Sequence, residues 1–177
     1  MSYICRRVYS PVLKKAVEEY LKAKGLAYTL NERDGFFKFS RDTGTELGVL
    51  DYRILIYKKG IMIYEILPFR EEIYTKKERQ ELLDFVISAS YGDPGCWTMD
   101  IRGDYGGEIA YRIYCDWGKE APDERWTPWL DRYFERMIPP MHNFMPGFED
   151  IIYNGTSYRW AMQLCIINML KEGMGDQ

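Results

Sequence analysis

The chain has 177 residues, and its 24 lysines and arginines against 27 aspartates and glutamates give a formal charge of −3. This balance excludes the strongly basic surface on which general nucleic-acid binding depends. Aromatic residues make up 16% of the sequence, a proportion that argues against disorder. The length fits one domain, or two small lobes that share a core, and it is sufficient for folding without disulfides or metals.

The amino-terminal stretch and the cysteines indicate the compartment. The first residues contain no long apolar segment, so we expect no signal peptide. Every apolar run is short and interrupted by charges, which predicts no membrane-spanning helix. None of the four cysteines has C-x-x-C spacing, which favours reduced thiols in a cytoplasmic protein; they are Cys5, Cys96, Cys115 and Cys165.

The first half reads as a helix followed by four strands. Ser10 and Pro11 have the residue types of an N-cap and a first helical position, and Gly25 ends the helix after about Lys24. Four extended segments follow, at 26–31, 36–41, 47–57 and 61–67. The connections between them are too short for parallel crossovers, so the strands are predicted to form an antiparallel meander.

A second helix and a hairpin follow. Thr75 and Glu78 have the spacing of a capping box, so a helix is expected from there to about residue 91. The turn residues 92–95 interrupt it, and two alternating segments, 96–102 and 108–117, flank the glycine-rich turn 103–107. The apolar side chains of the second segment share one face, which predicts a sheet covered on one side.

The carboxyl-terminal part is predicted to be helical but broken. Thr127 and Pro128 begin a third helix, and Pro139-Pro140 is expected to end it. A short piece at 148–153 is either helical or extended. A last helix is predicted over 157–171, closed by Gly173, and its apolar positions include Trp160, Leu164, Ile167 and Met169.

These elements predict an α+β fold in which an antiparallel sheet, built of a meander plus a hairpin, has helices packed on one face. We interpret residues 1–177 as one domain. Within it, residues 1–145 form the core and residues 146–177 form a helical extension.

The sequence contains no recognisable catalytic or metal-binding motif. The single histidine, His142, has no second histidine or cysteine at ligand spacing. Cys96 and Cys115 fall on the two hairpin segments, where they read as small core residues. The glycine clusters at 92–95 and 103–107 lack the lysine and hydroxyl residue of a P-loop. We therefore expect no catalytic residue, no metal and no cofactor.

The aromatic residues are the main candidates for a binding surface. Trp117, Trp126 and Trp129 bracket the loop 118–125, and Tyr105 lies in the hairpin turn. Aromatic side chains near loops are typical of protein and peptide interfaces. They are equally typical of the edges of a small core, so both interpretations stay open.

Three segments carry a resemblance to a known family. They are VEEYLKAKGLAYTL at 17–30, GFFKFS at 35–40 and RQELLDFVISASYGDPGCWTMDI at 79–101. In their order of helix, meander, helix and hairpin, residues 12–144 resemble the YbjN family of bacterial proteins, which are similar in fold to type III secretion chaperones. The resemblance implies a regulatory, chaperone-like protein that binds extended polypeptide segments, often as a dimer. It supplies no catalytic residues.

Two functional hypotheses follow. The first is a non-enzymatic module that binds a protein or peptide, including a second copy of itself, and binds neither nucleic acid nor membrane. An exposed strand edge of the hairpin would accept such a partner. The alternative is a small-molecule-binding protein or an enzyme of unrecognised type. It would use a pocket between the sheet and the carboxyl-terminal helices, near His142, Arg112 and Asp116. A structural subunit of a larger assembly is a third reading.

Overall fold

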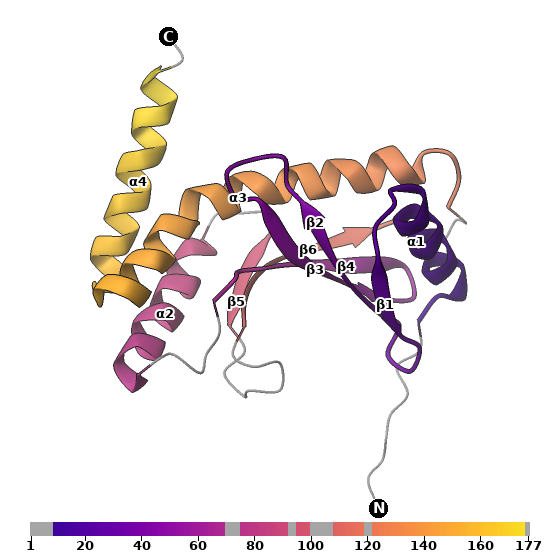
Figure 1. The fold of residues 1–177 in the computed structure, drawn as a ribbon, viewed down its shortest axis with the longest axis horizontal. Coiled ribbons are helices and arrows are strands. Elements are labelled where there is room, and N and C mark those ends of the chain that lie inside the picture. Colours follow the sequence, from indigo (N-terminus) through magenta and orange to yellow (C-terminus); the bar gives the residue numbers. More distant parts are fainter. Residues whose placement is uncertain (1–8, 70–74, 92–94, 100–107, 119–121, 176–177) are drawn as a thin grey trace, which may run out of the picture. The chain divides into compact units, whose positions relative to one another are not determined.

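This computed structural model describes residues 9–69, 75–91, 95–99, 108–118 and 122–175 (Figure 1). Within those ranges the elements follow one another as α1 (Pro11–Ala23), β1 (Tyr28–Asn31), β2 (Phe36–Asp42), β3 (Val49–Ile56), β4 (Gly60–Ile66), α2 (Lys76–Ala89), β5 (Cys96–Met99), β6 (Ile109–Asp116), α3 (Trp126–Asn154) and α4 (Tyr158–Gly175).

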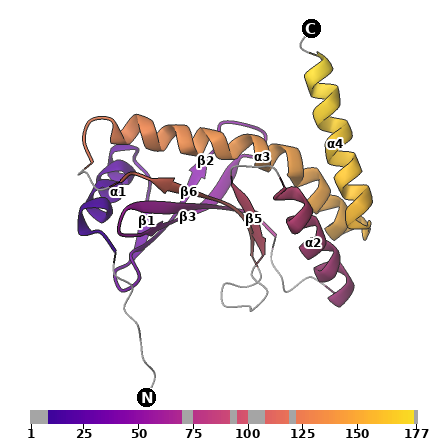
Figure 2. The same ribbon diagram turned by 180° about the vertical axis from the view of Figure 1, so that it is seen from behind.

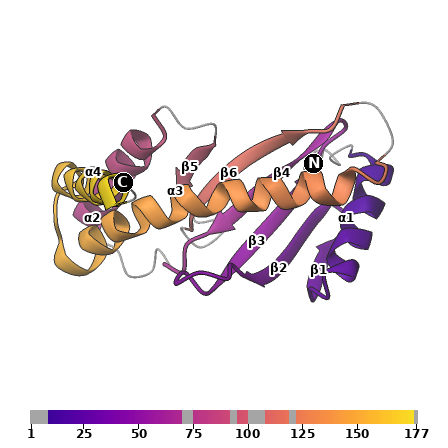
Figure 3. The same ribbon diagram turned by 90° about the horizontal axis from the view of Figure 1, so that it is seen from above.

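The strands form one six-stranded antiparallel sheet in the order β1-β2-β3-β4-β6-β5 (Figures 1 and 3). β1 to β4 are the predicted meander, and Gly35, at a φ of 62°, makes the first of its turns. β6 joins β4 through hydrogen bonds from Trp117 to Lys59 and from Leu67 to Ile109. The predicted α+β fold with an antiparallel sheet is confirmed, and its two edge strands are β1 and β5.

The chain divides into two compact units. The first comprises residues 1–66 and 112–135, and the second comprises residues 67–111 and 136–177. β6 and α3 each contribute residues to both units. The described residues of each unit have a buried core of their own.

In the first unit, α1 and the first turns of α3 cover one face of the sheet (Figures 1 and 3). Ser10 caps α1 by accepting a hydrogen bond from the backbone N–H of Leu13, as the sequence predicts. Phe134 of α3 lies at the centre of the core, with ring centroids 5.4 Å from Tyr52 and 6.0 Å from Tyr20. The opposite face of β3 stays largely open to solvent, because its alternate residues are exposed or half-buried.

In the second unit, α2 packs against the later turns of α3. The predicted capping box is present, with Thr75 and Glu78 each accepting a hydrogen bond from the other's backbone N–H. Phe85 of α2 contacts Phe148 of α3 at a centroid distance of 4.7 Å. Trp97 of β5 completes this core against Phe148 at 4.8 Å.

The prediction that Pro139-Pro140 ends the third helix is wrong. α3 continues through Pro139, Pro140 and Pro146 to Asn154, so the supposed boundary at 145–146 and the separate piece at 148–153 both lie inside one helix. Each interior proline removes a backbone hydrogen bond. Burial along one helical stripe offsets that loss; its members, spaced four, four and three residues apart, are Met137, Met141, Met145 and Phe148.

Two smaller differences concern the helix and strand ends. Gly173 does not close the last helix, because α4 runs to Gly175; a glycine inside a helix costs only about 1 kcal/mol. β5 is described as Cys96–Met99, and residues 100–102 of the predicted strand lie outside the described ranges. The hairpin turn 103–107 and most of the turn 92–95 also lie outside them.

Candidate protein-interaction surface

Helix α4 exposes a face of large apolar side chains. Its packed side is marked by Ala161 and Cys165, which are one turn apart and fully buried. At 100° per residue, Trp160 and Ile167 lie on the opposite side of the helix, and Leu164 lies on the flank between the two sides. Between 37% and 66% of each exposed side chain is accessible to solvent; we define the α4 face as Trp160, Leu164, Ile166, Ile167 and Leu170.

The area of this face is that of the largest apolar patch on a typical monomer. A large apolar side chain presents roughly 150 to 250 Å² when fully exposed, so the five together expose on the order of 500 Å². Soluble proteins seldom leave a larger apolar patch open, and patches of this size are often functional. No charged residue occurs from Trp160 to Leu170, so the face is uncharged along its length.

The orientation of α4 is fixed within the second unit. The backbone N–H of Tyr158, at the start of the helix, donates to Glu81 Oε2 of α2 at 2.9 Å. Gly155, at a φ of 64°, makes the turn between α3 and α4. Gly147 of α3 allows close approach, because a Cβ there would lie 2.8 Å from Cys165 Sγ. Figures 1 and 2 show α4 beside α2 and the end of α3, with its last turns extending past α2.

Sequence reasoning named three members of the α4 face only as apolar positions of the last helix. The signal that would have revealed the face is an excess of apolar residues. Nine of the eleven residues at 160–170 belong to the apolar set of Trp, Ala, Met, Leu, Cys and Ile. A helix resting on one side of a small unit buries about one stripe, so such a segment must expose the remainder.

The three candidate tryptophans, which flank one loop, form a cluster in the first unit. The rings of Trp117, Trp126 and Trp129 contact one another at centroid distances of 5.0 to 5.2 Å. Trp126 is buried, and the other two are half-buried. The indole N–H groups of Trp117 and Trp126 have no acceptor among the described residues. Since each ring face is largely occupied by its neighbours, the cluster offers less open surface than α4, and its role in binding stays a prediction. Tyr105, the fourth candidate, lies outside the described residues.

β5, the hairpin strand of the first hypothesis, lies at an edge of the sheet, where the backbone N–H of Trp97 donates to Ser90 Oγ at 2.9 Å. β5 is an edge strand, but its described part has only four residues, Cys96–Met99. A strand this short presents few unpaired backbone groups to a partner. The edge is therefore a weaker docking surface than the α4 face.

The residues of the alternative hypothesis belong to different units. Arg112 and Asp116 lie on β6 in the first unit, where Asp116 accepts a hydrogen bond from the backbone N–H of Gly118 at 2.9 Å. His142 lies half-buried on α3 in the second unit. Within the described ranges, no three or more His, Cys, Asp or Glu side chains gather as a metal site would require.

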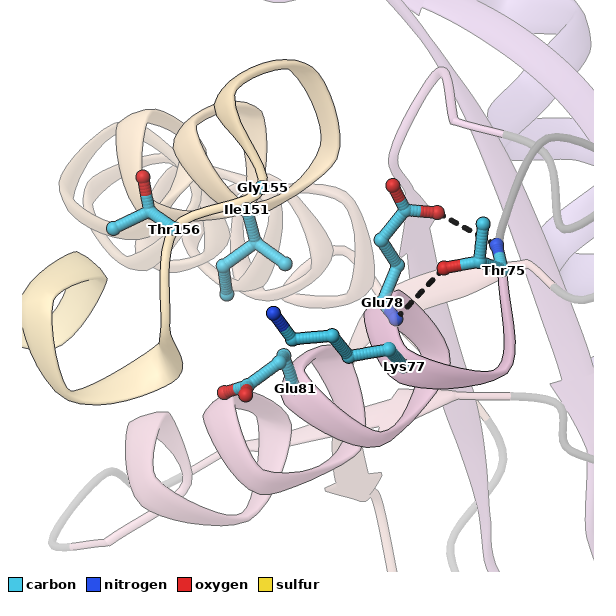
Figure 4. A pocket seen from close by; sticks show the side chains of 7 residues that line it. All are labelled: Thr75, Lys77, Glu78, Glu81, Ile151, Gly155 and Thr156. Carbon is cyan, nitrogen blue, oxygen red and sulfur yellow. Dashed lines mark hydrogen bonds between the residues drawn. The ribbon is translucent and has the colours of Figure 1, made fainter.

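A small pocket opens in the second unit between the start of α2 and the α3–α4 connection (Figure 4). Its volume is about 110 Å³, and it is lined by Thr75, Lys77, Glu78, Glu81, Ile151, Gly155 and Thr156. Thr75 and Glu78 are engaged in the capping box, and Glu81 holds the start of α4. The pocket is smaller than the roughly 300 to 1,000 Å³ of typical ligand sites, and three of the polar side chains that line it, Thr75, Glu78 and Glu81, serve helix ends.

Among the buried groups whose pKa is raised, one is a carboxyl group and two are thiols. Glu65 of β4 is fully buried and accepts a hydrogen bond from the Tyr52 hydroxyl, while its second carboxylate oxygen has no partner among the described residues. Burial raises the pKa of Glu65 to about 7. Burial also raises the pKa of the Cys115 thiol and brings that of Cys165 to about 11. Both thiols therefore stay protonated at neutral pH and are poor nucleophiles.

Comparison with protein-family models, with curated proteins and with solved structures finds no match to this chain. The resemblance to the YbjN family therefore rests on the sequence segments quoted above. None of the described helices combines the length and apolar character needed to cross a bilayer.

Proposed function

We propose that this chain is a non-enzymatic protein-binding module, chaperone-like in the way that the YbjN resemblance implies, and that the α4 face is its docking surface. The observation that carries the proposal is the uncharged face of five large apolar side chains on a helix held firmly at its start. The chemistry of the face selects the partner class. It fits an amphipathic helix that lays its own apolar side against α4.

The energetics favour occupation of this face. Burying on the order of 500 Å² at about 25 cal/mol per Å² would contribute on the order of 10 kcal/mol before the costs of association. Those costs take 4 to 15 kcal/mol or more, so the face supports an interface of moderate affinity. Since the face carries no charge, an apolar partner helix buries no unpaired ion on it.

Two further observations support a binding role over catalysis. The described pocket is small, and its Thr75, Glu78 and Glu81 side chains hold helix ends. The buried thiols of Cys115 and Cys165 are protonated at neutral pH. We also propose a cytoplasmic location; the free thiols of Cys96, Cys115 and Cys165 support it, because a reducing compartment preserves such thiols.

The test combines cross-linking in cells with reconstitution. A photoreactive residue replaces Trp160, and a matched one replaces Val12, an exposed apolar residue on α1 that lies outside the α4 face. We expect a discrete polypeptide adduct at position 160 and none at position 12. The captured polypeptide, once identified, is purified and its affinity for the wild-type chain is measured.

The Ile167→Glu variant supplies the specificity control. A glutamate at the centre of the face should weaken binding of the purified partner at least tenfold, because a buried unpaired carboxylate is strongly unfavourable. Ile167 is half exposed, so this variant should unfold at the same urea concentration as the wild type. Equal affinity of the variant and the wild type for the partner would refute the docking surface.

A further inference from the structure

The face of the sheet that α1 and α3 leave open carries a row of positive charges across four strands. Residues directly opposite each other on paired strands project from the same face. Lys38 of β2 lies opposite Arg53 of β3, and Arg53 lies opposite Tyr64 of β4. The backbone hydrogen bonds that join β4 to β6 place Tyr64 opposite Arg112. We define the basic row as Lys38, Arg53, Tyr64 and Arg112, which all belong to the first unit and are exposed or half-buried.

Two members of the basic row occupy an unfavourable arrangement. Like charges directly opposite each other on neighbouring strands are destabilising, and Lys38 and Arg53 are such a pair. Both cations lie over the ring of Phe36, with Lys38 Nζ 5.6 Å and Arg53 Cζ 5.9 Å from its centroid. The Asp51 carboxylate, two residues before Arg53 on β3, accepts a hydrogen bond from the Ser40 hydroxyl at 2.6 Å. An anion bound between the two cations would offset their repulsion.

A row of apolar and aromatic side chains lies next to the basic row. Phe36, Leu55 and Met62 are opposite one another on β2, β3 and β4, and the register between β4 and β6 adds Tyr114. Tyr114 is 45% exposed, and its ring contacts that of Tyr57 at a centroid distance of 5.8 Å. Proteins bind single-stranded nucleic acids through this combination of groups, with phosphates on the cations and bases stacked on the rings.

We infer that this open face binds a single-stranded nucleic acid. Its phosphates contact Lys38, Arg53 and Arg112, and its bases stack on Tyr64 and Tyr114. β2, β3, β4 and β6 are each paired on both sides, so their backbone groups cannot receive an added peptide strand, and recognition depends on side chains. The basic row spans three strand spacings, or about 14 Å, and four-stranded sheets that bind RNA stack two or three bases on such a face.

The placement of the cations explains why the sequence predicts no nucleic-acid partner. The chain as a whole has a formal charge of −3. Lys38, Arg53 and Arg112 belong to three different strands, and only the folded sheet brings them into one row. Lys58 and Lys59, exposed in the turn after β3, add positive charge at one end of this face. Three phosphate contacts predict weak binding, with the logarithm of the binding constant falling by about 2 per tenfold rise in salt concentration.

Fluorescence anisotropy with a labelled oligouridylate of about 12 nucleotides tests the inference on the purified full-length chain. The wild type should bind with a dissociation constant of about 1 to 100 μM at low salt. Lys38→Gln and Arg112→Gln should each weaken binding and reduce the salt slope by about 0.7, the contribution of one phosphate contact. Lys15→Gln removes an exposed charge from α1 and should change neither quantity. No binding by the wild type, or binding by both row variants with the wild-type affinity and slope, would overturn the inference.

The aromatic side chains are tested separately from the cations. Tyr114→Ala should weaken oligouridylate binding at least fivefold while leaving the salt slope unchanged, because it removes base stacking and no phosphate contact. Urea unfolding confirms that each variant is folded. A wild-type affinity for Tyr114→Ala together with Tyr64→Ala would overturn the stacking role. A duplex of equal length hides its base faces and should bind at least tenfold more weakly; equal binding of the duplex would also overturn that role.

Two competing anions test the choice of ligand. Polyglutamate of equal charge and phosphatidylserine vesicles should each bind at least tenfold more weakly than the oligouridylate, and equal or tighter binding of either would overturn the assignment to nucleic acid. The site is independent of the proposed function, because the α4 face belongs to the second unit. Ile167→Glu should therefore bind the oligouridylate like the wild type, and Lys38→Gln should keep its affinity for the polypeptide captured at position 160.

Discussion

Replacing Glu65 by Gln should remove a fall in stability of the first unit between about pH 5 and pH 8. Glu65 is fully buried, and its carboxylate accepts a hydrogen bond from the Tyr52 hydroxyl. Desolvation raises its pKa to about 7, against the opposing effects of the Tyr52 hydrogen bond and of the positive charge on Arg41. The folded protein therefore holds a proton on Glu65 that the unfolded chain releases near pH 4.5.

The sign and size of the effect follow from that difference. Because the folded pKa is raised, stability is highest below the unfolded pKa of about 4.5 and is lost as pH rises through about 7. A pKa raised from 4.5 to about 7 corresponds to about 3 kcal/mol of unfolding free energy, at 1.36 kcal/mol per pKa unit. The loss is essentially complete by about pH 8.

Gln keeps the acceptor oxygen for Tyr52 but does not titrate. Its amide N–H₂ replaces a carboxylate oxygen that has no partner among the described residues, so a cost of about 1 to 3 kcal/mol is expected at every pH. The diagnostic quantity is therefore the slope of stability against pH and not its absolute value. Desolvation opposes ionisation of Asp131, but hydrogen bonds from Lys24 and Tyr20 lower its pKa. Its titration therefore affects stability only below this pH window.

Urea unfolding at a series of pH values measures the slope. Tryptophan fluorescence is a suitable probe, because Trp117, Trp126 and Trp129 lie in the first unit. Tyr52→Phe supplies a second test, because it removes a hydrogen bond that lowers the Glu65 pKa. This variant should be less stable than the wild type at low pH, and its pH-dependent loss of stability should extend to higher pH. Parallel pH profiles for the wild type and Glu65→Gln would refute the reasoning.

Two predictions concern the docking of α4 in the second unit. Gly147→Ala should destabilise this unit by about 1 to 3 kcal/mol, although alanine is the better helix former, because its Cβ would lie 2.3 Å from the Phe85 ring and 2.8 Å from Cys165 Sγ; an unchanged or raised urea midpoint would contradict this. Glu81→Ala should cost about 1 kcal/mol, since it removes the acceptor for the Tyr158 N–H. Hydrogen exchange at the start of α4 should then accelerate, and Glu81→Gln, which keeps an acceptor oxygen, should show a smaller effect.

The elements predicted well from sequence are those fixed by local chemistry. Ser10 and Pro11 start α1, and the Thr75–Glu78 capping box starts α2, because these side chains satisfy backbone groups within one turn. The meander follows from short connections that admit only antiparallel neighbours. The tryptophan cluster is brought together because its members flank one loop, so their proximity is set by a short stretch of chain.

The helix α3 was mispredicted because its continuity depends on distant contacts. Local chemistry at Pro139-Pro140 favours a break. The helix persists because residues on both sides of the prolines, among them Met137 and Phe148, are buried on one stripe. The sequence alone reveals the prolines and the helix hydrogen bonds that they remove. The stabilisation from burial of the stripe depends on the residues that pack against it, which only the structure shows.

The exposed side of α4 could not be predicted from the sequence for a similar reason. In a helix with one apolar stripe, the stripe predicts which side is buried, so the sequence also predicts the orientation of the helix. α4 is apolar on nearly all sides, so its sequence is compatible with several orientations. Small residues determine the orientation of α4, because Ala161 and Cys165 allow this helix to approach α3 closely beside Gly147. Packing through the small side chains leaves the large ones, Trp160 and Ile167, facing outward. A chain selected only for stability would gain by reversing that arrangement, and this is the strongest argument that the large side chains are kept exposed for a partner.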